Sequence, residues 1–502
     1  MSVNCCRLSR AKPRKKKPDV YFKGSDWSVK DLEKAWKHME VVAKDFGISY
    51  YEPQFEIVSD SEMLEIFVYG LPVGYPHWSF GEQYAEAYSK YLDNPTHMAY
   101  EVVFNTDPSI CYIMGSNTLA EQLLVMAHAA VGHSNVFKNN LLFKDGTDAK
   151  NIMNLVTSFR SYILDCERKY GIKNVERIID CGHALMYSSV DAVSHRMTRD
   201  EKEAVEKNNK KTSENDYMFE CLLKNTISEE RSPERGETNL LKFIIDRSDY
   251  LEDWQRNILR TLSFIAQYFD PQRKTKILNE GFATLCEYVI LDEMYARGMV
   301  DPGIMIEMCA DNSGVTYQQG AFYQFESYYG TQNVLEPAVR FNPYALGLNV
   351  LRDIKRMCEK PDGQDRELFP NLVGKPYLEE VMNACHMNND SSFIHQYLGP
   401  KVITDMQMAA VFDDHSLDYY VVDYTARDKD YRDLKNVLAT QIERAYMPPE
   451  ITIHEYDKTR RTLTLNHKKR NGITLYQPYS QMTCDMIKYL MNFNSVFIEE
   501  AK

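Results

Sequence analysis

Apolar residues recur at intervals of three and four through most of the first 400 residues, which restricts this part of the chain to a mainly α-helical architecture. From Trp27 to Phe46 the pattern has the regularity of an amphipathic helix, and a second helix is predicted over 60–68. The same spacing predicts helices over about 118–132, 147–169, 174–188, 251–269, 272–297 and 343–359, with a break at Pro271. We therefore expect a large helical domain over 27–402.

After about residue 400 the pattern changes to short β-rich runs. Four strands are predicted at Tyr419–Val422, Ile451–Tyr456, Thr462–Asn466 and Val496–Glu499, with helices over 429–445 and 478–492 between them. The order βαββαβ is that of a ferredoxin-like fold. The expected fold class is α+β, with residues 403–502 as a separate small domain.

Charge distribution defines two further segments and disfavours one class of partner. The net charge of −13 argues against general attraction to nucleic acid. Basic residues are concentrated in 1–26, which we interpret as a flexible arm, and a charged stretch over 198–238 is interpreted as an insertion. Neither segment is assigned a function.

Apolar run lengths and cysteine usage indicate the compartment. No apolar run approaches the roughly 18 residues of a membrane span, and the basic N-terminus lacks the apolar stretch of a signal peptide. The eleven cysteines are scattered without a regular framework, and an odd number favours a reducing compartment. We expect a cytoplasmic protein.

Familiar nucleotide-binding and hydrolase motifs are absent. The chain has no GxGxxG, GxxxxGK[ST], GxSxG or HExxH sequence, which removes the best support for nucleotide binding and serine hydrolysis. The remaining candidates are histidines and carboxylates in three predicted helices.

The first of these helices ends with His128 and His133. On an ideal α-helix residues five apart differ by about 140°, against about 40° for an i, i+4 pair, so the spacing is imperfect for chelation. Gly132 could release the helix into a left-handed or bulged turn that brings the rings together. Metal ligation and simple core packing are both open for this pair. Glu121 fits a capping box with Thr118, and Ala129 stands where HExxH proteins carry a general base.

The other two helices carry Asp180 with His183, and Glu280 with Glu287. Asp180 could orient the His183 ring, although a surface His–Asp pair fits equally well. Glu280 and Glu287 share a face among apolar neighbours, where carboxylates are costly to bury unless paired or metal-bound, while a solvated face would remove that cost. The string around Glu280 is similar to the gluzincin stretch whose Glu is the third zinc ligand.

Together these segments resemble the SpoVR (stage V sporulation protein R) family from about residue 27 to 500. The resemblance rests on Tyr75-Pro-His-Trp-Ser-Phe-Gly81, Ala127-His-Ala-Ala-Val-Gly-His133, Phe137-Lys-Asn-Asn140, Cys181 with His183-Ala-Leu185, Asn279-Glu-Gly-Phe-Ala283, Asn342-Pro-Tyr-Ala-Leu-Gly347, Ser392-Phe-Ile394 and Pro400-Lys-Val402. It implies a cytoplasmic protein with a helical N-terminal domain, zincin-like metal-binding helices and a role in forming the spore cortex. Family members more often carry His at the position of Glu287, and they carry another His near the position of Asn312.

The leading hypothesis is a metal-dependent hydrolase acting on peptide or peptidoglycan-related amide bonds. Zinc is the expected metal, with iron as the alternative. The expected ligands are His128, His133 and Glu280, with His183 or Glu287 completing the site. Glu287 is the expected general base, and Asp180, His77 and Tyr344 are expected to support the pocket.

The rival hypothesis is a non-catalytic regulatory or scaffold protein with a structural metal. Its C-terminal domain would then bind a protein partner. Ala129, which replaces the usual base, favours this rival.

Overall fold

The computed structural model describes residues 25–69, 75, 77–93, 101–189, 239–318, 341–408, 410–412, 421–423, 430–446, 449–469 and 474–501. It divides into two compact units, and each consists of three separate stretches of the chain. Unit 1 comprises Met1–Met63, Met98–Lys144 and Gln272–Ala445, and unit 2 comprises Leu64–His97, Asp145–Pro271 and Tyr446–Lys502. This division differs from the expected sequential domains 27–402 and 403–502. The insertion at 198–238 and nearly all of the arm at 1–26 lie outside the described residues.

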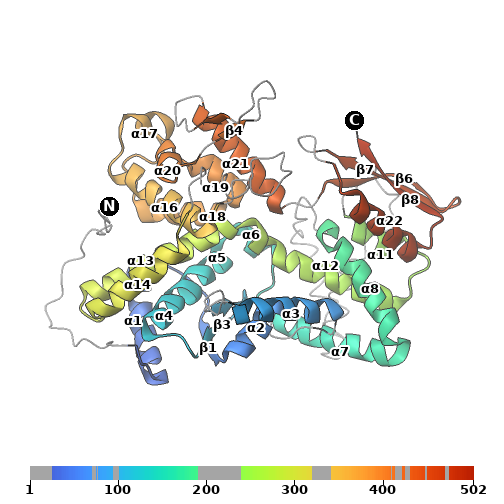
Figure 1. Cartoon of the computed structure of the whole chain (residues 1–502), viewed down its shortest axis with the longest axis horizontal. Coiled ribbons are helices and arrows are strands. Elements are labelled where there is room, and N and C mark those ends of the chain that lie inside the picture. Colours follow the sequence, from blue (N-terminus) through green and yellow to red (C-terminus); the bar gives the residue numbers. More distant parts are fainter. Residues whose placement is uncertain are drawn as a thin grey trace, which may run out of the picture. The chain divides into compact units, whose positions relative to one another are not determined.

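Unit 1 is mainly helical, with a three-stranded and a two-stranded sheet (Figure 1). Its elements are α1 Val29–Asp45, β1 Pro53–Val58, β2 Glu101–Val103, β3 Ser109–Met114, α4 Leu119–Val125, η2 Met126–His133, α5 Ser134–Asn139, α13 Lys276–Ala296, α14 Pro302–Val315, α16 Pro343–Glu359, α17 Gly363–Leu368, α18 Tyr377–Met387, α19 Asp390–Tyr397, α20 Pro400–Asp405, β4 Ala410–Phe412, β5 Val421–Asp423 and α21 Asp430–Tyr446. Helices α2 Asp60–Tyr69, α6 Leu141–Gly146 and α12 Asp253–Lys274 span sequence positions where the chain passes from one unit to the other.

The three-stranded sheet of unit 1 was not predicted from the sequence. Its order is β1-β3-β2, with β1 parallel and β2 antiparallel to β3. Cys111 of β3 packs against Ala129 and Ala130 of η2, and Trp36, Phe55 and Val103 surround this contact. The sheet therefore supports the helical segment that carries the two histidines.

Helix α13 packs closely against η2 and α16 through glycines. A Cβ added to Gly132 of η2 would lie 2.4 Å from Cα of Ala283 on α13. A Cβ added to Gly347 of α16 would lie 2.1 Å from the carbonyl oxygen of Ile277 on α13. Only glycine permits such close packing of η2 and α16 against α13.

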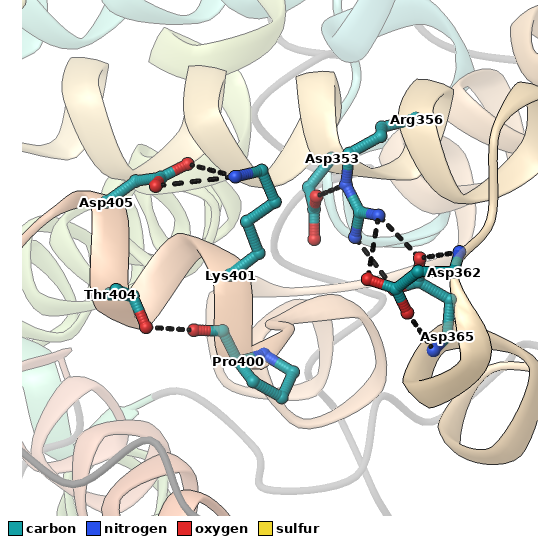
Figure 2. A network of polar contacts seen from close by, with 8 residues as sticks. All are labelled: Asp353, Arg356, Asp362, Asp365, Pro400, Lys401, Thr404 and Asp405. Carbon is teal, nitrogen blue, oxygen red and sulfur yellow. Dashed lines mark hydrogen bonds and ion pairs between the residues drawn. The ribbon is translucent and has the colours of Figure 1, made fainter.

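A polar network joins α16 to α17, as Figure 2 shows. Arg356 donates from Nε to Asp353 at 2.6 Å and from a terminal nitrogen to Asp365 at 2.7 Å. Asp365 also caps α17 together with Asp362. Both aspartate partners of Arg356 are buried, so the planar guanidinium neutralises two carboxylates at once.

Replacing Arg356 by lysine is expected to lower the free energy of unfolding by about 1–2 kcal/mol, because one ammonium cannot bridge both carboxylates. Urea denaturation followed by circular dichroism measures this difference. The exposed Arg366 gives a matched control, and Arg366→Lys is expected to change stability by less than about 0.5 kcal/mol. Equal losses in both variants would contradict the bridging role.

Unit 2 contains helices and a small C-terminal sheet. Its elements are α3 Trp78–Asp93, α7 Ile152–Tyr170, α8 Ile172–Leu185, η3 Met186–Ser189, α11 Leu240–Arg247, β6 Ile451–Asp457, β7 Thr462–Lys468, α22 Gln477–Met491 and β8 Ser495–Ala501, together with most of α12. Its core includes residues from α7, α8, α11, α12, α22 and the sheet. Helix α12 continues through Pro271 to Lys274, so the predicted break at Pro271 is wrong, and the chain leaves the helix at Thr275.

The C-terminal sheet differs from a ferredoxin-like fold. All the predicted strands and helices form, but β5 pairs antiparallel with β4 in a separate two-stranded sheet. The remaining sheet has the order β6-β7-β8, with an antiparallel β6-β7 pair and a parallel β7-β8 pair. In the described residues the C-terminal module is therefore ββαβ. Among those residues, no helix is long and apolar enough to cross a membrane.

Candidate metal centre

His128 and His133 are brought together by a π-helix. Segment η2 lies between α4 and α5, and in a π-helix the backbone hydrogen bonds join residues five apart. The two histidines therefore stand one turn apart, with ring centroids at 4.5 Å. Gly132 is not among the described residues with positive φ, so the rings meet because the whole segment widens rather than through a left-handed glycine.

Glu280 of α13 completes a group of three possible ligands. One of its carboxylate oxygens, Oε2, lies 3.5 Å from Nε2 of His128 and 3.5 Å from Nε2 of His133. The ligand atoms of this group all lie within 4.8 Å of one another, and it is the one such group in the part of the chain that the structure describes. Tetrahedral zinc with bonds of about 2.0–2.1 Å places its ligand atoms about 3.3 Å apart, close to these separations.

Two of the atoms that face each other in this group are buried without a hydrogen-bond partner. Nε2 of His128 and Oε2 of Glu280 are buried and form no hydrogen bond. Leaving a buried nitrogen lone pair and a carboxylate oxygen unsatisfied is costly, and a cation between them removes the cost. The residues therefore fit a divalent metal.

The outer ring nitrogens are held by two other residues of α13. Nδ1 of His128 contacts Oε1 of Glu287, and Nδ1 of His133 donates to Oδ1 of Asn279 at 2.9 Å. A donated Nδ1–H leaves the lone pair on Nε2, the form in which imidazole binds a metal. Glu287 thus lies behind His128, away from the ligand atoms, and the geometry favours an orienting role over the expected general base.

Three buried carboxylates give this region a strongly negative potential. Burial opposes a charge on His128, but Glu287, Glu280 and Glu101 together raise its pKa above the ordinary value. Burial, together with the positive charge on His128, lowers the pKa of His133 to about 4. Burial raises the pKa of Glu287. The same potential that holds a proton on His128 would attract a divalent cation in its place.

Glu101 and Tyr344 lie beside the three possible ligands. Oε1 of Glu101, on β2, is 3.9 Å from Nε2 of His128, and burial raises the pKa of Glu101 to about 7. Tyr344 stacks on His128 with ring centroids at 6.0 Å, and its phenol faces Glu280. Sequence reasoning missed Glu101 because it missed β2. The β-branched pair Val102–Val103 and the apolar run Ile110–Met114 were the available signals.

Two other positions have clear roles. Glu121 and Thr118 form both hydrogen bonds of a capping box on α4, which confirms the structural interpretation of Glu121. Asn312 is buried on α14 and faces Glu287.

His183, Asp180 and His77 belong to unit 2 and are not among the grouped ligands. Nε2 of His183 accepts from the Tyr75 hydroxyl at 2.6 Å, and Nε2 of His77 donates to Asp180 at 3.1 Å. Helix α8, which carries Asp180 and His183, packs in unit 2, whereas η2 and α13 belong to unit 1. His183 is not in the ligand group that the described residues form, and its expected role as a fourth ligand supported by Asp180 and His77 stays a prediction.

Stability is expected to decline in mild acid because of His183. Burial, and secondarily His77, lower its pKa to about 4 in the folded protein, against 6.5 ordinarily. Below pH 6.5 the unfolded chain binds a proton that the folded chain does not. The free energy of unfolding should therefore fall between pH 6.5 and about 4, by up to about 1.4 kcal/mol per pH unit. Denaturation of wild type and His183→Gln across this range tests the effect, and equal slopes would contradict it.

The comparisons with known proteins identify the family of this chain. A family model described as "SpoVR like protein" matches residues 26–447. A relative from Escherichia coli (strain K12), described as "Uncharacterized protein YcgB", is 35% identical over 463 residues, which cover 90% of this chain and 88% of the relative. No solved structure matches the chain. The family match covers both candidate histidines, Glu280 and Tyr344 and spans far more than half of the sequence, so this chain belongs to the family of SpoVR-like proteins.

Proposed function

We propose that the protein is a metal-dependent hydrolase of amide bonds in peptides or peptidoglycan. The observation that carries this proposal is the convergence of two imidazole nitrogens and one carboxylate, of which His128 Nε2 and Glu280 Oε2 are buried without a hydrogen bond. Two histidines and a glutamate with a remaining open position are typical of catalytic zinc sites. Zinc is the proposed metal, and iron is the alternative because Fe(II) binds the same ligand types.

His128, His133 and Glu280 would hold the metal, and the surrounding residues supply the other roles. A divalent cation held there would polarise a carbonyl group and lower the pKa of a bound water. Glu101 is not among the grouped ligand atoms, but its Oε1 lies 3.9 Å from His128 Nε2, beside the metal position. We assign the general base to Glu101 by this geometry, and Glu287 keeps His128 in its binding tautomer. The Tyr344 hydroxyl would donate to the developing oxyanion.

Metal content tests the site independently of any substrate. Protein purified without an affinity tag or chelator is expected to contain about one equivalent of metal by mass spectrometry. His128→Ala and Glu280→Ala should lose it while remaining folded by circular dichroism. Folded wild-type protein that takes up no zinc or iron on reconstitution would refute the proposal.

Catalysis is tested separately with peptide and muropeptide mixtures analysed by mass spectrometry. New products are expected with wild type, whereas Glu101→Gln should retain the metal and form none. A metal-loaded protein that cleaves neither mixture would refute the hydrolase activity but not the metal site.

The second candidate is a regulatory or scaffold protein with a structural metal. Exposed Tyr476 at the N-cap of α22, with exposed Tyr479 and Met482 on the helix, favours it, because an apolar stripe on the C-terminal module suits a protein partner. X-ray absorption of the metal distinguishes the two, since a structural site has four protein ligands and a catalytic site has an open position.

A further inference from the structure

A second group of polar side chains surrounds His77 in unit 2 and has no part in the proposed metal chemistry. It joins two segments that are more than 100 residues apart in sequence, the start of α3 and the C-terminal half of α8. The Tyr75 hydroxyl binds His183, and the rings of His77 and His183 lie 4.6 Å apart. The His77 side chain is 1% exposed, so its polar contacts are fixed by the protein.

Each ring nitrogen of His77 has one side-chain partner. Oγ of Ser79 lies 2.7 Å from Nδ1, and Oδ1 of Asp180 lies 3.1 Å from Nε2. A hydroxyl on one nitrogen and a carboxylate on the other is the arrangement in which serine nucleophiles are activated, and it is recognised by geometry rather than by sequence position. The absence of a GxSxG motif therefore does not decide the matter.

Two further hydrogen bonds fix the protonation and orientation of the ring. The backbone N–H of Ser79 donates to Nδ1 at 3.3 Å, so Nδ1 is the acceptor nitrogen and the proton lies on Nε2. The indole N–H of Trp78 donates to the same Asp180 oxygen at 3.0 Å. Burial lowers the pKa of His77, which keeps the ring neutral and leaves the Nδ1 lone pair able to take a proton.

The nucleophile end of this arrangement is partly accessible. Ser79 is half-buried in the first turn of α3, and the adjacent Trp78 is 55% exposed. An exposed indole held by a hydrogen bond offers an apolar surface for the acyl part of a substrate.

We propose that Ser79, His77 and Asp180 form a second reactive site, which transfers acyl groups from esters or thioesters to water. Ser79 Oγ attacks the carbonyl carbon while its proton passes to His77 Nδ1. The leaving alcohol or thiol takes that proton, and the acyl group remains on Ser79. Water, deprotonated by His77, then hydrolyses the acyl-serine and restores the starting state.

A fluorophosphonate probe tests the nucleophile without knowledge of the substrate. Full-length wild-type protein is expected to be labelled at Ser79, as identified by peptide mass spectrometry. Ser79→Ala should abolish the label, whereas Ser480→Ala, a control on α22 of the same unit, should retain it. Labelling should be unchanged by a metal chelator, which separates this site from the proposed metal centre. Absence of label in folded wild type would overturn the proposal.

The relay is tested by Asp180→Asn, which preserves shape and removes the charge. Its labelling rate should fall at least about tenfold. An unchanged rate would mean that the contact of Ser79 with His77 only caps the helix, and it would overturn the proposal.

Because Asp180→Asn could disturb the fold, Ser79→Cys gives an independent measurement. Iodoacetamide should alkylate the new thiol at least about tenfold faster than the exposed Cys309 in the same chain, and an equal or lower rate would also overturn the relay.

Discussion

Gly347→Ala is expected to destabilise the protein by about 3 kcal/mol, because the added methyl group has no space. Its carbon would lie 2.1 Å from the carbonyl oxygen of Ile277 and 2.7 Å from Cα of Gly281. Both neighbours are backbone atoms of α13, so they cannot rotate away, and the helices must separate. Because α13 carries Glu280 and α16 carries Tyr344, metal affinity should fall as well.

Gly314→Ala is the matched control for this variant. Gly314 is also in a helix, α14, but none of the described residues has an atom within 4 Å of an added Cβ. Alanine is favoured over glycine in helices, so this variant should be as stable as wild type or up to about 1 kcal/mol more stable. Guanidinium denaturation followed by circular dichroism compares the two. If Gly347→Ala were as stable as wild type, helices α13 and α16 could move apart without a loss of stability, and the prediction would be wrong.

Glu287→Gln is expected to weaken metal binding about 10- to 100-fold without removing a ligand. The glutamine oxygen can still accept from Nδ1 of His128, so the variant isolates the negative charge behind the ring. Competition with a chromophoric chelator measures the affinity. Glu101→Gln, which also removes one buried carboxylate, should change the affinity by less than about threefold, because its oxygen is not among the ligand atoms.

The pair of variants separates charge from position. If Glu287→Gln and Glu101→Gln lowered the affinity equally, the effect would be the loss of any nearby negative charge, and the orienting role of Glu287 would be wrong. Asn279→Asp makes the opposite change behind His133 and should increase the affinity.

The helices predicted from the sequence form with ends within about five residues of the expected ones, because apolar periodicity is a local signal. Helices α3, α5, α6, α11, α14 and α17 to α20 were not predicted. Helix α16, expected over 343–359, begins and ends at those residues, and β6 and β7 differ from prediction only at their ends. Pairing is not local. The expected strand at 419–422 overlaps β5, yet its partner is β4, which the sequence pattern did not reveal.

The candidate site was predicted in part, for the same reason. His128, His133 and Glu280 were selected by residue type, and the structure brings them together. Helical geometry at 100° per residue placed the two histidines on different faces, because a sequence pattern does not show a change from α- to π-helical winding. Glu101 was missed with its strand, and the role of His183 as a fourth ligand stays a prediction because it is not in the ligand group of the described residues.

The π-helical winding of η2 has a consequence for the detection of such sites by pattern. A helix that admits one additional residue within a turn converts an H-x3-H pair into an H-x4-H pair while keeping both rings on one side. Pattern searches that require two histidines four apart pass over this chain, although its histidine rings are adjacent. Insertion of a single residue can therefore hide a pair of metal ligands from the motif that defines it elsewhere, without moving either ligand away from the metal.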